Sequence, residues 1–233
     1  MSHTPILASG SVIKRKLNAI RPVSGGGPVP PSGLVFFNAE TLVPVPAETP
    51  SGAALAERVL FDSYLTTITP ETFEEFVPEG GGLDMGLAPL FSNGNEFHFT
   101  LLSNVTGFAA NANGRYNTTT GGVYYVEMSS GGVDIEIVFD DFVAGFGAYF
   151  SDMGDFTKAW TATITDENDV VTVVPFDNTV DGPNGSLIFW GWLDNTGLLY
   201  KSVSFQASGG GVQSDGVGID DIITPSTADI DFG

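Results

Sequence analysis

The stretch that decides the fold is Trp160-Thr161-Ala162-Thr163-Ile164-Thr165, followed by Asp166-Glu167-Asn168-Asp169 and then by Val170 to Phe176. Apolar and polar side chains alternate with a period of two in the first part, which is the pattern of a strand with one buried face. The four polar residues that follow are typical of a turn, and the Val-rich run after them is typical of a second strand. The segment therefore predicts a β-hairpin.

The same kind of pattern continues on both sides of this hairpin. Ile135, Ile137 and Phe139 alternate with more polar neighbours. Further apolar runs of strand length cover residues 143–150, 187–193, 199–207 and 217–223. Short strands separated by Gly, Asn and Asp turns, at spacings of about 8–12 residues, predict an all-β chain that folds as an antiparallel β-sandwich of the jelly-roll type. A short helix is predicted only over residues 52–60.

Charge is divided unevenly along the chain. Residues 1–39 carry Lys14, Arg15, Lys16 and Arg21 and no acid, whereas residues 40–233 carry all 28 acids and only four basic residues. We expect the basic residues to dock on an acidic protein surface, either of a neighbouring copy or of a different partner. The formal net charge of −20 argues against nucleic acid as the main partner and against an anionic membrane surface.

Composition predicts two regions. Residues 1–50 are expected to be an extended, basic arm and linker, because Gly25-Gly26-Gly27-Pro28 and the prolines around it favour flexible and extended backbone. Residues 51–233 are expected to form the acidic sandwich domain. The chain has no cysteine, which excludes disulfides and cysteine catalysis. Ser9-Gly10-Ser11 interrupts the apolar start and the positive charges follow it, so we expect no signal peptide and synthesis in the cytoplasm.

Three stretches are distinctive, together with Thr72-Phe73-Glu74 near the start of the domain. They run from Phe146 to Phe156, from Asn184 to Gly191 and from Gly218 to Ile222. They resemble the β-sandwich domains of bacterial exported proteins, often those with PEP-CTERM sorting tails, over about residues 70–223. The resemblance implies a jelly-roll module, although the chain departs from those proteins in its expected lack of a signal peptide and of a C-terminal apolar anchor.

Jelly-roll modules are also used in phage particles, which are assembled in the cytoplasm. The resemblance and the charge division together predict a non-enzymatic virion protein, and more narrowly a capsid decoration (cement) protein. Its partners would be the major capsid protein or neighbouring copies of itself, with the chain forming a homo-oligomer. A tail or fibre component is the alternative within the virion.

Two tryptophans carry a further alternative. Trp190 and Trp192 fall on one face of a predicted strand, with Phe189 and Gly191 on the other. Exposed, the two indoles would form a platform for sugar rings, and the chain would be an extracellular carbohydrate-binding module. Burial of such large apolar groups is favourable by about 25 cal/mol per Å², so we predict a place in the core or in a subunit interface.

No cofactor is required by any motif, but three acids suggest a cation. Glu74 lies at the start of the domain, and Asp220 and Asp221 lie in the last strand. First and last strands are often neighbours in jelly rolls, so these carboxylates could meet around a structural Ca²⁺, which favours several hard oxygen ligands. The alternative is that they face solvent at a strand edge or accept hydrogen bonds from a turn.

Catalytic patterns are weak. The chain has two histidines, His3 and His98, and no Gly-x-Ser-x-Gly segment around a nucleophilic serine. A glycosidase needs only two carboxylates, and among so many acids no pair stands out. We therefore predict that the chain is not an enzyme.

Overall fold

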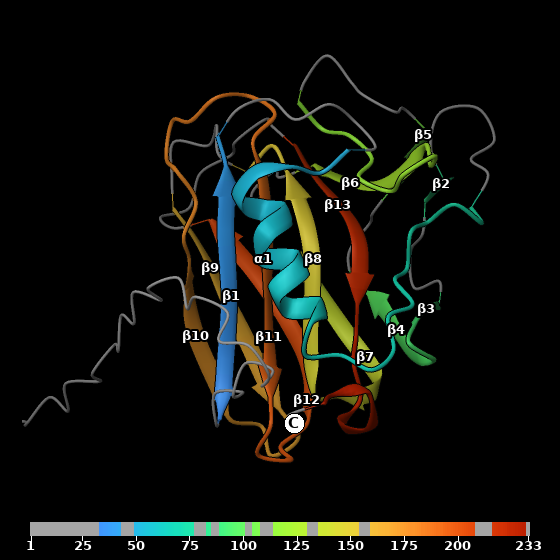
Figure 1. The fold of residues 1–233 in the computed structure, drawn as a ribbon, viewed down its shortest axis with the longest axis vertical. Coiled ribbons are helices and arrows are strands. Elements are labelled where there is room, and N and C mark those ends of the chain that lie inside the picture. The colour runs from blue at the N-terminus through green and yellow to red at the C-terminus, as the bar shows by residue number, and fades with distance from the viewer. Residues whose placement is uncertain are drawn as a thin grey trace, which may run out of the picture.

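Two antiparallel sheets pack face to face, and one helix covers the outer side of the larger sheet (Figure 1). This computed structural model describes residues 33–42, 49–76, 83–84, 89–100, 104–107, 114–129, 135–153, 159–207 and 216–231. The predicted all-β, antiparallel β-sandwich is confirmed.

The larger sheet has the strand order β1–β11–β8–β13–β6–β5–β2. Its strands are β1 (Leu34–Thr41), β11 (Leu187–Asp194), β8 (Gly145–Ser151), β13 (Gly216–Ile223), β6 (Tyr124–Ser129), β5 (Asn104–Gly107) and β2 (Leu83–Asp84). The smaller sheet has the order β10–β9–β12–β7–β4–β3. Its strands are β10 (Val171–Phe176), β9 (Trp160–Asp166), β12 (Tyr200–Ala207), β7 (Ile135–Val143), β4 (Asn95–Phe99) and β3 (Leu90–Ser92).

Strands β6 to β13 pair as a nested series. β9 pairs with β10, β8 with β11, β7 with β12 and β6 with β13, each time antiparallel. The second half of the series therefore runs back along the first half, strand by strand. The innermost pair is the hairpin predicted from residues 160–176, with Asp169 at a positive φ of 65° in its turn.

The core between the sheets is aromatic. Every residue of β8 and β11 is buried, and their inward-facing rings meet those of the opposite sheet. Phe146 stacks on Trp192, its neighbour in the same sheet, at 5.4 Å between ring centroids, and Trp190 stacks on Phe176 of the opposite sheet at 5.8 Å. Phe205 closes edge-on against Trp190 at 5.2 Å.

The outer face of β8 and β11 is covered by helix α1 (Gly52–Asp62). Phe61 of the helix lies edge-on to Phe189 of β11 at 5.4 Å and to Phe37 of β1 at 5.2 Å. Gly147 permits this contact, because a Cβ at that position would lie 3.0 Å from the Phe61 ring. The predicted short helix is thus confirmed. In the part of the chain that the structure describes, no helix is both long and apolar enough to cross a membrane.

The predicted arm and linker, residues 1–50, needs a correction. Residues 34–41 form β1, which pairs with β11 over all eight of its residues. Phe37 is buried under α1, and this burial stabilises a strand that the Gly- and Pro-rich surroundings did not suggest. The sandwich therefore begins at β1, and the basic residues at 14–21 precede it.

Gly191 provides a test of the close approach between β8 and β11. A Cβ on Gly191 would lie 2.4 Å from the carbonyl oxygen of Phe146 and 2.9 Å from the Cα of Gly147, both backbone atoms that cannot move aside alone. Gly191→Ala is expected to lower the free energy of unfolding by about 1–3 kcal/mol, measured by urea denaturation. Ser204→Ala, on the half-exposed outer side of β12, is the control. An unchanged Gly191→Ala midpoint would contradict this packing.

Candidate functional site

The richest polar cluster surrounds residues 114–119, which cross the larger sheet without forming a strand. Arg115, Tyr116, Asn117 and Thr118 are all buried, and their polar contacts reach several elements of the fold, among them β6 and β13. Tyr116 donates its hydroxyl to the carbonyl of Gly185 at 3.2 Å. Residues 114–119 form no strand, so side-chain hydrogen bonds hold this segment in place instead of β-sheet hydrogen bonds.

Asp220 lies beneath this segment and is buried. Its Oδ2 accepts hydrogen bonds from the backbone N–H of Thr118 at 2.7 Å and of Thr119 at 3.2 Å, and its Oδ1 accepts from the N–H of Asp221 at 2.8 Å. Burial, followed by the neighbouring Asp221 charge, raises the pKa of Asp220 well above the usual range of aspartate, while the backbone hydrogen bonds oppose that rise.

Two threonine hydroxyls lie between the carboxylates of Asp220 and Asp221. The Oγ1 of Thr118 is 2.9 Å from Asp220 Oδ2 and 2.9 Å from Asp221 Oδ2. The Oγ1 of Thr119 is 3.4 Å from Asp220 Oδ2 and 2.9 Å from Asp221 Oδ1. A hydroxyl has one proton to donate, so two hydroxyls cannot satisfy all four contacts with two ionised carboxylates. A proton held by the pair would supply a third of the four contacts and so reduces the shortfall, in the direction of the raised pKa of Asp220.

Glu74 joins the same segment through other partners. Its Oε1 accepts from the side-chain amide of Asn117 at 2.9 Å and from the backbone N–H groups of Val123 and Tyr124 at 2.8 and 2.9 Å. Glu74 therefore caps the chain that leads into β6.

The three acids predicted to bind Ca²⁺ thus contact one segment but different residues of it. Glu74 accepts hydrogen bonds from Asn117 and Tyr124. Asp220 and Asp221 accept hydrogen bonds from Thr118 and Thr119. Among the described residues, no group of three or more His, Cys, Asp or Glu side chains is arranged to hold a metal ion. The contacts observed are those of the alternative, carboxylates that hold a turn. A calcium site at these residues stays a prediction.

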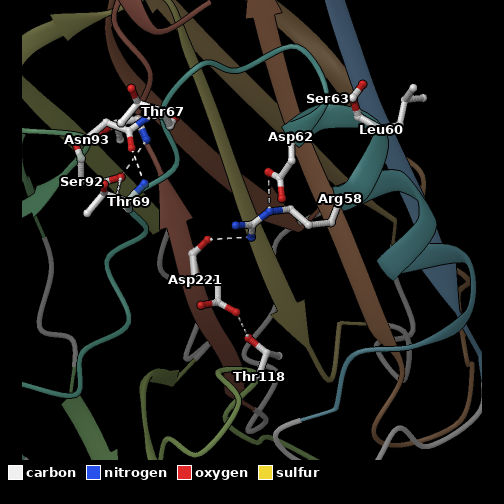
Figure 2. Close-up of polar contacts among 11 residues, drawn as sticks. Arg58, Leu60, Asp62, Ser63, Thr67, Thr69, Ser92, Asn93, Thr118 and Asp221 are labelled. Carbon is white, nitrogen blue, oxygen red and sulfur yellow. Dashed lines mark hydrogen bonds and ion pairs between the residues drawn. The ribbon is translucent and has the colours of Figure 1, made fainter.

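Arg58 links α1 to this region, as Figure 2 shows. Its Nε lies 2.8 Å from Asp62 Oδ1, and its Nη1 donates to the backbone carbonyl of Asp221 at 3.3 Å. The guanidinium also lies over the rings of Tyr149 and Phe189, 5.6 Å from each centroid. A buried cation is thus compensated by a carboxylate, a carbonyl and two ring faces.

The same burial acts on the groups around Arg58. It raises the pKa of Asp62, and the Arg58 charge works against that rise. It also raises the pKa of the Tyr149 hydroxyl, again opposed by Arg58. The cluster is accordingly a set of structural contacts between α1, β8 and β13.

Trp190 and Trp192 lie in the core, which the sequence analysis preferred to an exposed position. Trp190 and Trp192 are both fully buried between the sheets. The alternative of an exposed sugar platform at these two residues is therefore corrected, because opposite aromatic rings cover both indoles. Phe189 faces the other side of β11, toward α1, as the period of two requires.

Lys14, Arg15, Lys16 and Arg21 lie outside the described residues, so their docking role stays a prediction. His98 is described: its Nδ1 lies 2.7 Å from Asp140 Oδ2, on the outer side of the smaller sheet.

The sequence patterns did not predict that the segment 114–119 is buried. Its closest signal was the pair of adjacent threonines, whose hydroxyls suit a turn held by carboxylates.

No protein-family model matches this chain, and no curated protein sequence shows a significant match. The likeness to exported bacterial sandwich domains therefore stays an expectation that rests on its motifs.

The buried carboxyl groups predict how stability depends on pH. A carboxyl with a higher pKa in the folded chain binds more protons there, so its contribution to stability is largest at low pH and is lost as pH rises through that pKa. Asp220, Asp62, Glu57 and Glu71 all have pKa values raised by burial. We expect the free energy of unfolding to fall as pH rises above about 4, the ordinary range of carboxyl pKa values.

Asp221→Asn should shift this dependence. Without the Asp221 charge the pKa of Asp220 drops, so the loss of stability moves to lower pH. Asparagine also tolerates the positive φ of 52° at this position. Asp181→Asn, at an exposed positive-φ turn, is the matched control. Urea midpoints measured across the pH series would contradict the assignment if Asp221→Asn followed the wild-type curve.

Proposed function

We propose that this chain is a non-enzymatic assembly protein, and specifically a capsid decoration protein that docks through its basic N-terminal segment. The observation that carries the proposal is the division of charge: four basic residues and no acid in residues 1–39, against all 28 acids in the remainder. A basic segment is attracted to acidic protein surfaces, while acidic bodies repel one another and stay separate between docking points.

The attachment of the segment supports an anchoring role. The segment joins the sandwich at Gly33, whose N–H donates to Asn195 Oδ1 at 2.5 Å. It then continues directly into β1, whose eight residues all pair with β11. A force on the segment would therefore act on β1, whose backbone hydrogen bonds to β11 lie next to the core. Such a strand resists force better than a surface loop does.

The strand pairing supports the finer fold assignment. We infer a jelly roll from the nested pairs β6–β13, β7–β12, β8–β11 and β9–β10, because a long antiparallel ribbon wrapped around a core brings strands together in this way. Jelly rolls serve in viral capsids and in lectins. Burial of Trp190 and Trp192 removes the residues on which a sugar site was predicted, so the capsid role is the one we propose.

The four basic residues provide the test. A variant with Lys14→Gln, Arg15→Gln, Lys16→Gln and Arg21→Gln keeps β1 intact, which a deletion of residues 1–39 would not. It is expected to lose binding to source particles stripped of this protein, because the attraction to an acidic surface is gone. Wild-type binding should weaken as salt is raised, because salt screens exposed charges.

The control carries Lys158→Gln and Lys201→Gln and should bind as the wild type does. Bound protein is measured by co-sedimentation, and circular dichroism checks the fold of each variant. Wild-type binding by the quadruple variant would overturn the docking role, and the tail or fibre alternative would require binding at low copy number instead.

A further inference from the structure

The outer face of the smaller sheet differs from the rest of this acidic chain. The register of β10, β9 and β12 brings side chains of small polar and valine type together in rows. They are Val171, Val173, Thr161, Thr163, Thr165, Ser202, Ser204 and Gln206. None of these eight carries a charge, although the formal net charge of the chain is −20; charge returns on the neighbouring strand β7, where Glu136 lies opposite Ser204. The part of this face formed by β10, β9 and β12 therefore brings no carboxylate toward an approaching copy from these eight positions.

Strand β10 forms the edge of this face (Figure 1). Among the described residues it pairs with β9 alone. The side chains of Val171 and Val173 are 56% and 64% exposed, which is unusual for apolar groups placed together on a strand edge. Natural edge strands are commonly protected by charged side chains or proline; β10 has a proline only near its end, at Pro175, and no charged residue.

The free backbone groups of β10 can be assigned from the hairpin. The N–H of Asp166 donates to the carbonyl of Val170 at 3.0 Å, and the register pairs Val171 with Thr165. Backbone groups alternate in direction along a strand, so those of Thr172 face β9 and those of Val171 and Val173 face away from the sheet. Pro175 occupies the next outward position and has no N–H to donate.

We infer that β10 is a homodimer contact, in which β10 of two copies pairs antiparallel across a two-fold axis at Thr172. Val171 then lies opposite the partner's Val173, and Val173 opposite the partner's Val171. Each opposed pair exchanges two backbone hydrogen bonds, and the four valines form one apolar cluster on the outer face. The pairing continues the smaller sheet of one copy into that of the other.

The occupant is a second copy because the edge is complementary to itself. Its free donors and acceptors are placed symmetrically about Thr172, as an isologous contact requires. Asp169, in the turn beside the edge, is already paired with Lys201 of the same chain. The like net charge of two copies predicts that dimerisation strengthens as salt is raised. That is the opposite of the salt effect expected for docking by the basic segment, so failure of either proposal can be recognised separately.

The chain contains no cysteine, which permits a sharp test of the register. Directly opposed residues that do not exchange hydrogen bonds have Cα atoms about 4.5 Å apart, within the range that a disulfide spans. The full chain with Thr172→Cys is therefore expected to form a disulfide-linked dimer under mild oxidation. Val59→Cys, 58% exposed on α1, is the control and should link far more slowly.

Sedimentation equilibrium of the uncrosslinked chain gives the second measurement. As the protein concentration is raised from about 10 to about 200 µM, the wild type and Val59→Lys are both expected to pass from monomer toward dimer. Val173→Lys should weaken dimerisation by at least about tenfold, because it places a charge on the paired edge. A monomeric wild type, unchanged association of Val173→Lys, or cross-linking of Thr172→Cys no faster than the control would each overturn the inference.

Discussion

The structure depends on one pair of strands, β8 and β11, that is buried on both faces. Trp190, Trp192 and Phe146 fill one side and require an opposing sheet to cover them. Phe189 lies on the other side and requires the helix. Water must be excluded from both faces because the pair carries large aromatic groups in either direction. The order of layers, helix on sheet on sheet, follows from this requirement.

The polar groups of the body are placed by the same constraint. Covering the outer face brings Arg58 of α1 beside Asp221, and it brings the segment 114–119 over Asp220. The carboxylates of Asp220 and Glu74 satisfy backbone N–H groups and polar side chains of the segment 114–119 and the chain that follows it. The body carries a large surplus of negative charge, and like charges on two copies repel one another. We propose that attraction comes from the basic segment and from the uncharged face beside β10.

Sequence patterns predicted most of the sandwich because a period of two marks half-buried strands directly. The alternation of Thr161, Thr163 and Thr165 with buried neighbours placed β9 and its hairpin correctly. β1 was hidden among glycines and prolines, since its burial depends on a helix that follows it and on a strand about 150 residues later. The contacts of Asp220 were out of reach for a similar reason. Thr118 lies 102 residues from Asp220 in sequence. A local sequence pattern therefore does not predict which turn a buried carboxylate binds.

The central claim is that this body is held on a larger particle through its basic N-terminal segment. It is tested most directly by density-gradient fractionation of the source lysate, with quantitative mass spectrometry of this protein in every fraction. The account predicts that the protein co-sediments with particles at a fixed, high copy number. Recovery only as a free species at the top of the gradient would contradict it.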